Sequence, residues 1–297
     1  MRSRALAAVF LVALIVQAPA ATATGSKSAA ILLAAGDIAD CSSDGAALTA
    51  RLIARQPGTV AAIGDTAAPD GTTSEFERCY APTWGRFKSR TRPALGNHEY
   101  GTGNADAYFA YFGKRAAAPG GYYSYELGTW HIVVLNSNCD FVPGGCASGS
   151  PQLRWLRADL ASHRTRCTLA YWHHPRFSEG PDTAARPDQA LATQPFWAAL
   201  VKAGAEIVLT GHDHLYERFA PLDAAGRQDP KRGLREFVVG TGGRPHYPVV
   251  AHVAGNQKVV TNHWGVLRLQ LSAKGYRWQF LSTPNGTTLD SGASNCH

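Results

Sequence analysis

The feature that most constrains this chain is a set of five short fragments in which a metal-ligating residue type directly follows an apolar run. Each run has the length and composition of a β-strand, and each fragment carries Asp, Asn or His. The fragments are Gly36-Asp37, Gly64-Asp65, Gly96-Asn97-His98-Glu99, Trp172-His173-His174-Pro175 and Gly211-His212-Asp213-His214. One Gly-Asp pair is weak evidence, because glycine is common in turns. Five such strand ends in one chain indicate a shared site, since ligands bind at the carboxyl ends of strands in open α/β sheets.

Strand-like and helix-like segments alternate through much of the chain, which indicates an α/β fold. Strand-like runs cover 31–35, 60–63, 131–136, 168–172 and 207–210, and helix-like stretches cover 45–55, 152–162 and 194–203. Shorter β-like runs follow at 235–240, 259–270 and 276–282. We expect two mixed β-sheets packed face to face and flanked by helices, a four-layer α/β/β/α sandwich. We also expect the residues from 251 onward to complete the second sheet.

The first residues have the pattern of a secretory signal peptide. Arg2 and Arg4 precede an apolar stretch at 5–16, and small residues follow around Ala20. A membrane-spanning helix needs about 20 apolar residues, and no segment of the chain reaches that length. We therefore expect residues 1–23 to be removed, leaving a secreted single domain at 24–297 with no membrane span.

Six cysteines are consistent with export, because an even set without a Cys-x-x-Cys pair favours disulfides over a zinc site. Cys139 and Cys146 enclose a short loop and are expected to pair. One arrangement of the other four joins Cys41 to Cys79 and Cys167 to Cys296, although sequence alone does not determine connectivity.

The charge of the chain is mildly basic, with a formal net charge of +7 at pH 7. The Lys and Arg residues are scattered along the chain and form no basic block, and no base-stacking motif accompanies them. This distribution favours small anionic substrates over nucleic acid. The sequence gives no indication of oligomeric state.

The order of the five fragments resembles the calcineurin-like metallophosphoesterase family. The continuation Leu215-Tyr216-Glu217-Arg218 after the last fragment is similar to the purple acid phosphatase branch. The phrases at 121–125 and 235–243 are also similar to secreted bacterial members of that branch. The resemblance extends from Gly36 to about Gly243. It implies hydrolysis of a small phosphorylated substrate, a phosphate monoester, by a hydroxide that bridges two metal ions.

Carried over position by position, the resemblance implies which residues hold the two ions. Asp65 would bridge them, and Asp37 and His214 would bind one ion. The other ion would be held by Asn97, His173 and His212. Carboxylate, amide and imidazole ligands together suit Fe, Mn or Zn better than Ca.

Three further residues are candidates for catalysis. The resemblance places His98 beside the leaving oxygen as a general acid or charge stabiliser, and Glu99 is expected to accept the other proton of the His98 ring. His174 has two interpretations: it faces the phosphate from the second coordination sphere, or it is only the neighbour of a ligand in a tight His-Pro turn.

One position departs from the purple acid phosphatase pattern. That branch has a metal-binding Tyr three residues after the second Gly-Asp, and this chain has Ala68 there. The first metal site then keeps Asp37, Asp65 and His214, with space for water or for Asp40 or Tyr100. Three hypotheses follow: a phosphatase that tolerates a weaker first site, a non-catalytic or feebly active phosphate- or metal-binding descendant, and a hydrolase of nucleotides or phosphodiesters.

Overall fold

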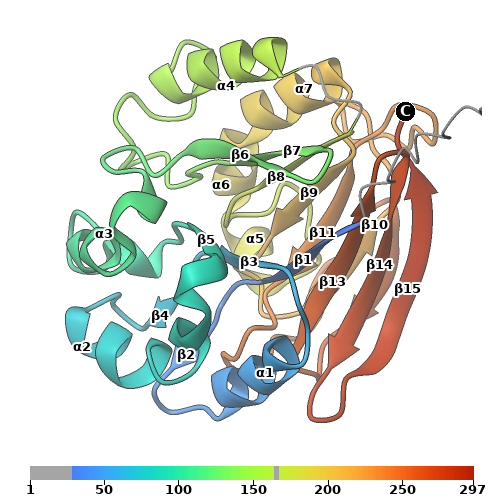
Figure 1. The fold of residues 1–297 in the computed structure, drawn as a ribbon. Helices are drawn as coiled ribbons and strands as arrows, with labels where there is room; N and C mark the ends of the chain where they lie inside the picture. Colours follow the sequence, from blue (N-terminus) through green and yellow to red (C-terminus); the bar gives the residue numbers. More distant parts are fainter. Residues whose placement is uncertain (1–28, 164–166) are drawn as a thin grey trace, which may run out of the picture.

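The computed structural model describes residues 29–163 and 167–297. The expected signal peptide at 1–23 lies outside the described residues. None of the helices in the described ranges is long and apolar enough to cross a membrane. Two large sheets lie face to face with helices on their outer sides (Figure 1), so the predicted α/β fold with two mixed sheets is confirmed.

The first sheet combines strands from both ends of the chain. Its order is β15-β14-β13-β1-β3-β5, with β1, β3 and β5 parallel and the C-terminal strands antiparallel. The strands are β1 (Ala30–Ala35), β3 (Thr59–Ile63), β5 (Thr91–Ala94), β13 (Gly265–Ser272), β14 (Gly275–Ser282) and β15 (Thr287–Asn295). In Figure 1 the three C-terminal strands form the red wall beside the blue β1.

The second sheet has the order β12-β10-β11-β9-β8-β7-β6. Neighbours β7, β8, β9 and β11 run parallel, while β6, β10 and β12 are antiparallel to theirs. The strands are β6 (Tyr123–Leu127), β7 (Trp130–Val134), β8 (Cys167–Tyr171), β9 (Ile207–Thr210), β10 (Tyr216–Phe219), β11 (Arg235–Val239) and β12 (Asn256–Val260). A two-stranded ribbon, β2 (Ala39–Asp40) with β4 (Ala67–Ala68), joins the loops that follow β1 and β3.

Helices cover both outer faces (Figure 1). Against the second sheet lie α4 (Pro151–Ser162) and α7 (Gln194–Ala203), and against the first lies α1 (Gly45–Ala54). The shorter helices are α2 (Thr73–Glu75), η1 (Phe76–Tyr80), η2 (Trp84–Arg90), η3 (His98–Tyr100), α3 (Asp106–Phe112), η4 (Gly113–Ala116), α5 (Pro181–Ala185) and α6 (Pro187–Ala192). Ser150 caps α4, with its hydroxyl accepting from the Leu153 N–H.

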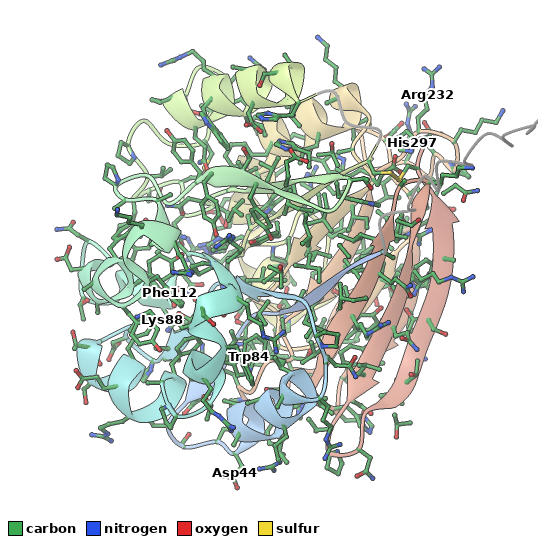
Figure 2. The ribbon with its side chains drawn as sticks, in the orientation of Figure 1. Asp44, Trp84, Lys88, Phe112, Arg232 and His297 are labelled. Atoms are coloured by element: carbon green, nitrogen blue, oxygen red, sulfur yellow. A yellow bond between two sulfur atoms is a disulfide. The ribbon has the colours of Figure 1, made fainter. Side chains whose placement is uncertain are left out.

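Alternating side chains of the central strands fill two separate cores. In β7, Ile132 and Val134 face the first sheet, while Val133 packs with the α4 and α7 side chains. Both faces of the strand are therefore buried, which explains why such strands are continuous apolar runs in the sequence. Trp84 is fully buried beside α1 (Figure 2), where its indole N–H donates to the Thr49 hydroxyl at 2.9 Å.

Two details of the predicted architecture are wrong. The run at 259–270 is two strands, β12 and β13, that belong to different sheets. The C-terminal segment therefore does not simply complete the second sheet: β13, β14 and β15 extend the first one through the β1–β13 pairing. The segment between the two strands, around Asn262, carries the chain from one sheet to the other.

Disulfides join all three predicted cysteine pairs. The bridges are Cys41–Cys79, Cys139–Cys146 and Cys167–Cys296. The third ties β8 of the second sheet to the end of β15 in the first, and thus links the two sheets covalently. Such bridges are typical of proteins that fold in an oxidising compartment.

Candidate metal centre

The predicted ligands come from the carboxyl ends of strands in both sheets. Asp37, Asp65 and Asn97 follow the parallel neighbours β1, β3 and β5. His173 and His212 follow the parallel neighbours β8 and β9 of the facing sheet. Because parallel strands end at the same edge of a sheet, and the two sheets face each other, short loops bring these side chains to one point.

One group of ligand atoms gathers around the Asp65 carboxylate. Asp65 Oδ2 lies 3.2 Å from His173 Nε2, which in turn lies 3.1 Å from Asn97 Oδ1. Ligand atoms of Asp65, His173 and His212 all lie within 4.8 Å of one another. All three of these residues are buried. The arrangement has the carboxylate, amide and imidazole donors that a transition-metal ion takes.

A second group lies at Asp37. Its Oδ1 is 3.4 Å from His214 Nε2 and has no hydrogen-bond partner in the described part of the chain, although the residue is fully buried. Its Oδ2 accepts a hydrogen bond of 2.8 Å from the backbone N–H of His212. A buried carboxylate oxygen without a hydrogen bond is costly, and a cation between Asp37 and His214 would satisfy it.

Backbone carbonyl groups orient two of the imidazoles for metal binding. The Nδ1 of His173 is 2.9 Å from the Ile63 oxygen, and the Nδ1 of His214 is 2.8 Å from the Pro245 oxygen. Because a carbonyl oxygen only accepts, each Nδ1 carries a proton, and Nε2 is the ring atom that faces the carboxylates and would bind an ion. The residues present therefore fit a pair of metal ions.

Three of the ligand candidates have a backbone conformation that non-glycine residues rarely adopt. The φ angles are 57° at Asp37, 47° at Asp65 and 70° at His212. Such left-handed residues cost free energy, and they persist where the surrounding structure enforces them, often at functional sites. In this protein they turn the side chain inward directly after the strand ends.

Glycines before the ligands allow the motifs to pack against one another. A Cβ atom on Gly96 would lie 2.1 Å from Asp65 Oδ1, and one on Gly211 would lie 2.7 Å from Asp37 Oδ2. Neither position has room for a side chain. The Gly-Asn and Gly-His pairs of the sequence are thus explained by close approach of backbone to carboxylate.

The three buried imidazoles differ in the direction of their pKa shifts. Burial opposes charge on His173, but the Asp65 carboxylate raises the pKa of His173 to about 10. The same pairing holds the pKa of Asp65 well below its usual range, although burial acts to raise it. Burial and the neighbouring imidazoles lower the pKa of His212 well below its usual value and that of His174 to about 3. His212 and His174 are therefore neutral, the form in which imidazole binds a metal ion.

His98 lies beside the candidate centre. Its backbone N–H donates to Asp65 Oδ1 at 3.0 Å, and its ring Nε2 is 3.5 Å from Asp65 Oδ2. The ring Nδ1 contacts the Pro69 carbonyl oxygen, and Nε2 lies 2.6 Å from a guanidinium nitrogen of Arg244. A carbonyl only accepts and a guanidinium only donates, so the ring proton is assigned to Nδ1 and Nε2 is an acceptor.

Glu99 corrects one expectation, because its carboxylate is not the partner of the His98 ring. It accepts from the backbone N–H groups of Asp65 at 3.0 Å, Thr66 at 2.6 Å and Gly96 at 2.6 Å, and from the Thr66 hydroxyl at 2.7 Å. Burial, together with the Asp65 charge, raises the pKa of Glu99. The residue clamps the second fragment to the third instead of orienting His98, whose ring is held by Pro69 and Arg244.

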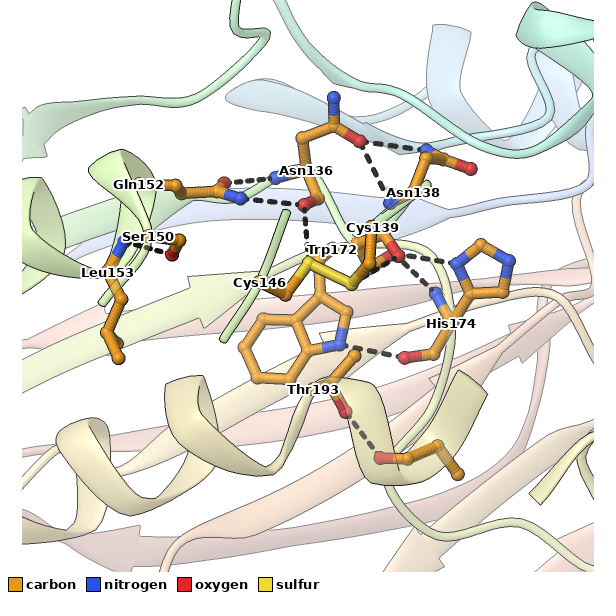
Figure 3. The surroundings of a disulfide bond; sticks show 12 residues. Asn136, Asn138, Cys139, Cys146, Ser150, Gln152, Leu153, Trp172, His174 and Thr193 are labelled. Atoms are coloured by element: carbon orange, nitrogen blue, oxygen red, sulfur yellow. Dashed lines mark hydrogen bonds between the residues drawn. A yellow bond between two sulfur atoms is a disulfide. The ribbon is translucent and has the colours of Figure 1, made fainter. Parts of the chain in front are cut away.

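His174 is held by Ser137, which lies in the loop after β7. The Ser137 hydroxyl lies 2.8 Å from His174 Nδ1 and accepts from the His174 backbone N–H at 3.0 Å. The Nε2 of His174 is buried without a hydrogen-bond partner among the described residues. Figure 3 shows His174 beside the Cys139–Cys146 bridge. A small cavity of about 90 Å³ lies there, lined by Asn97, Ser137, Asn138, Cys139, Asp140, Phe141, His174, Asp188, Gln189 and Ala192.

Ala68 is fully buried, and in the β2–β4 ribbon it pairs with Asp40. Tyr100 does not turn toward Asp37: its hydroxyl accepts from the Asn136 amide at 2.9 Å, and its ring stacks on Phe141. Asp40 is partly buried, and the charges of Arg244 and His214 act on it.

Sequence reasoning missed two residues at this site, Arg244 and Tyr247. Both lie in the loop after β11, another strand of the second sheet that is parallel to β9. Arg244 contacts His98, and the Tyr247 ring stacks on the His214 imidazole with 3.9 Å between centroids. The sequence holds a partial signal, because it predicts a strand at 235–240, but the fragment after that strand has no Asp, Asn or His directly behind its glycine.

Comparisons with known proteins agree with this geometry. The family model "Calcineurin-like phosphoesterase" matches residues 18–216. An uncharacterized protein of Mycobacterium tuberculosis is 30% identical in an alignment of 186 positions that covers 51% of this chain and 35% of the relative. Purple acid phosphatase 18 of Arabidopsis thaliana is 29% identical over 150 residues, 50% of this chain and 31% of the relative. The chain thus spans about a third of the length of these relatives.

Among solved structures, a purple acid phosphatase from yellow lupin (Lupinus luteus) seeds superimposes with a TM-score of 0.70. The match covers 91% of this chain and 54% of the lupin chain at 18% sequence identity. At that identity the likeness establishes the fold alone.

Proposed function

The chain belongs to the calcineurin-like phosphoesterase family, in its purple acid phosphatase-like branch, and on that basis we propose that it is a secreted phosphatase acting on phosphate monoesters at a dinuclear metal centre. The observation that carries the proposal is the presence of two ligand groups, one around Asp65 and one formed by Asp37 and His214. Asp37 and His214 would hold one ion. Asn97, His173 and His212 would hold the other, with Asp65 between the two.

Bound metal ions would polarise the phosphoryl group and supply a nucleophile derived from water. The chain's own residues then position the substrate. Asn97 and His174 both line the small cavity beside the centre, so a leaving group seated there would contact them. In its hydrogen-bonded arrangement His98 accepts at Nε2, and it would protonate a leaving oxygen only after taking up a proton.

Secretion is supported by two features of different origin. The sequence of 1–23 has the pattern of a signal peptide, and the three disulfides suit an oxidising compartment. We propose that the mature protein begins at about residue 24, a position that N-terminal sequencing of exported protein would check.

A second candidate function is a non-catalytic phosphate- or metal-binding protein on the same fold. The observation in its favour is Ala68, which offers no ligand where the purple acid phosphatase pattern has a Tyr. A weaker first site would lower metal occupancy, and a centre with one ion lacks the paired charges that stabilise phosphoryl transfer. Metal content and turnover separate the two candidates.

The test measures the metal content of the mature protein and its hydrolysis of an aryl phosphate, before and after loading with Fe, Mn or Zn. We expect two ions per chain, and turnover that falls by about 100-fold or more in His98→Ala, the range for loss of an acid–base or charge-stabilising group. His252→Ala is the matched control, because the His252 side chain is 96% exposed. One ion per chain and no turnover with any metal would refute the phosphatase and leave the binding protein.

A further inference from the structure

Arg244 places a guanidinium group inside the candidate centre. One of its terminal nitrogens, Nη1, lies 2.6 Å from His98 Nε2 and 3.7 Å from Asp65 Oδ2. The side chain is 14% exposed, so it reaches the carboxylate from within the protein. A fixed cation at this distance from the central carboxylate acts on any anion that binds there.

The backbone of Arg244 is held on both sides. Its N–H donates to the Asp37 carbonyl oxygen at 3.0 Å, and its carbonyl oxygen accepts from the Trp264 indole at 2.8 Å. Two residues before it, the Gly242 N–H donates to the Gly36 carbonyl oxygen at 2.9 Å. These contacts tie the loop after β11 to the loop after β1, so the backbone that carries the guanidinium is held in place at the strand ends.

The guanidinium has hydrogen-bonding capacity that the described residues do not use. Arginine carries five N–H donors, and the hydrogen bond of its side chain in the described ranges goes to His98. Its Nε is buried and has no partner among those residues. Buried donors are normally satisfied, and guanidinium groups are well suited to phosphate oxygens.

The charge of the centre also suits an anion. Ala68 stands where the purple acid phosphatase pattern has a Tyr that binds metal as an anion, and Arg244 adds a positive charge nearby. The missing Tyr removes one negative charge relative to that pattern, and the guanidinium of Arg244 brings a positive charge to the centre. A more positive site favours the more highly charged of two competing substrates.

We propose that Arg244 binds the substrate by donating to a non-bridging phosphoryl oxygen, and that this contact selects phosphate monoesters over diesters. The inference rests on the proposed function. A monoester has three non-bridging oxygens and a diester two, so a monoester keeps one oxygen for Arg244 when the other two face metal ions. A monoester also carries the greater negative charge. His98 is then the positioning residue that holds the guanidinium by accepting its N–H at Nε2.

The alternative role for Arg244 is that of a counterion which only neutralises Asp65. The two roles differ in what the loss of the side chain changes. A counterion would affect metal content and stability, whereas a substrate-binding residue affects the affinity for phosphate in protein that retains its metal. The variants Arg244→Gln and Arg244→Lys separate loss of the charge from loss of the planar donor group.

The experiment titrates inorganic phosphate into metal-loaded protein by calorimetry, with metal content and thermal midpoint measured on the same samples. We expect Arg244→Gln to weaken phosphate binding by about 10- to 100-fold, the loss of one charge-assisted contact, with Arg244→Lys intermediate. Metal content stays unchanged. The control is Arg268→Gln, because Arg268, in β13, contacts Gln56 and Gln279 and makes no hydrogen bond to a candidate ligand among the described residues. We expect its phosphate affinity to stay at the wild-type value.

Substrate selection is then read from an aryl phosphate monoester and the matching diester. We expect Arg244→Gln to lower kcat/KM for the monoester at least about 10-fold more than for the diester. Equal loss on both substrates overturns the selectivity. Unchanged phosphate affinity in Arg244→Gln, loss of metal in that variant, or a wild-type protein that does not bind phosphate overturns the binding role. A wild-type protein that binds phosphate but hydrolyses nothing refutes the phosphatase alone, because the titration tests Arg244 without turnover.

Discussion

The carboxyl group of Glu217, buried in β10, makes the stability of this protein depend on pH. Glu217 is fully buried, and its Oε1 accepts from the Glu179 N–H at 3.0 Å and from the Asn256 amide at 2.7 Å. Burial, with the nearby carboxylates of Asp213 and Glu179, raises the pKa of Glu217 to about 8. The folded protein therefore holds this group in its neutral form well above the pH at which an exposed glutamate ionises.

The direction of the effect follows from where the proton is held. Below a pH of about 4.5, the ordinary value, the group is protonated in both states and contributes no pH dependence. Between about 4.5 and 8 the unfolded chain releases the proton and the folded protein keeps it, so the free energy of unfolding falls as pH rises. At about 1.4 kcal/mol for each pKa unit, the loss reaches roughly 5 kcal/mol above pH 8.

The variant Glu217→Gln tests this loss of stability, because an amide keeps an acceptor for Glu179 and Asn256 and cannot ionise. Urea unfolding is measured at about pH 5 and about pH 8.5, at one fixed metal concentration. We expect the free energy of unfolding of the variant, relative to the wild type, to be roughly 3 to 5 kcal/mol higher at about pH 8.5 than at about pH 5. The exposed residue Glu77 supplies the control, Glu77→Gln, with no such gain. A difference between Glu217→Gln and wild type that is equal at both pH values would refute the reasoning.

Two further predictions concern the first metal site and the disulfides. Ala68→Tyr is expected to retain the first metal more strongly and, with ferric iron, to show a visible absorption band. The control Ala68→Phe supplies a ring without a ligand atom and is expected to show neither effect. Absence of both effects in the Tyr variant would mean that position 68 does not face that metal. Replacing both cysteines of Cys167–Cys296 by Ala is expected to cost about 5 kcal/mol in chemical unfolding, against about 2 kcal/mol for Cys139–Cys146, because the bridges join residues 129 and 7 positions apart. The reverse order would contradict this loop-entropy argument.

The sequence predicted the fold where strands are buried on both faces. Runs such as 31–35 and 207–209 are continuously apolar, and the structure has β1 and β9 there. The strand β15 was not predicted, because Thr287–Asn295 is polar and largely exposed at the edge of its sheet. β15 pairs with β14 through hydrogen bonds between backbone groups, and these leave little trace in the pattern of side chains.

The convergence of the candidate ligands on one place was predictable because they follow strand ends, but their supporting contacts were not. Glu99 is adjacent to His98 in sequence, which suggested contact between the two side chains. In the structure its carboxylate turns to the N–H groups of Asp65, Thr66 and Gly96. Adjacent residues in a tight turn point in different directions, and backbone donors that must be satisfied there leave no signal in the sequence.

Arg244 and Ala68 together show why a motif alone does not define this centre. The loss of a ligand at Ala68 suggests weaker activity when the position is considered by itself. The cation at Arg244 lies 3.7 Å from Asp65, however, and it would bind a phosphate directly, a contact that does not depend on a Tyr at position 68. If the Arg244 contact carries part of the substrate affinity, then Ala68→Tyr should strengthen metal retention without improving phosphate affinity in Arg244→Gln. Phosphate titration of the double variant measures whether the two positions act independently.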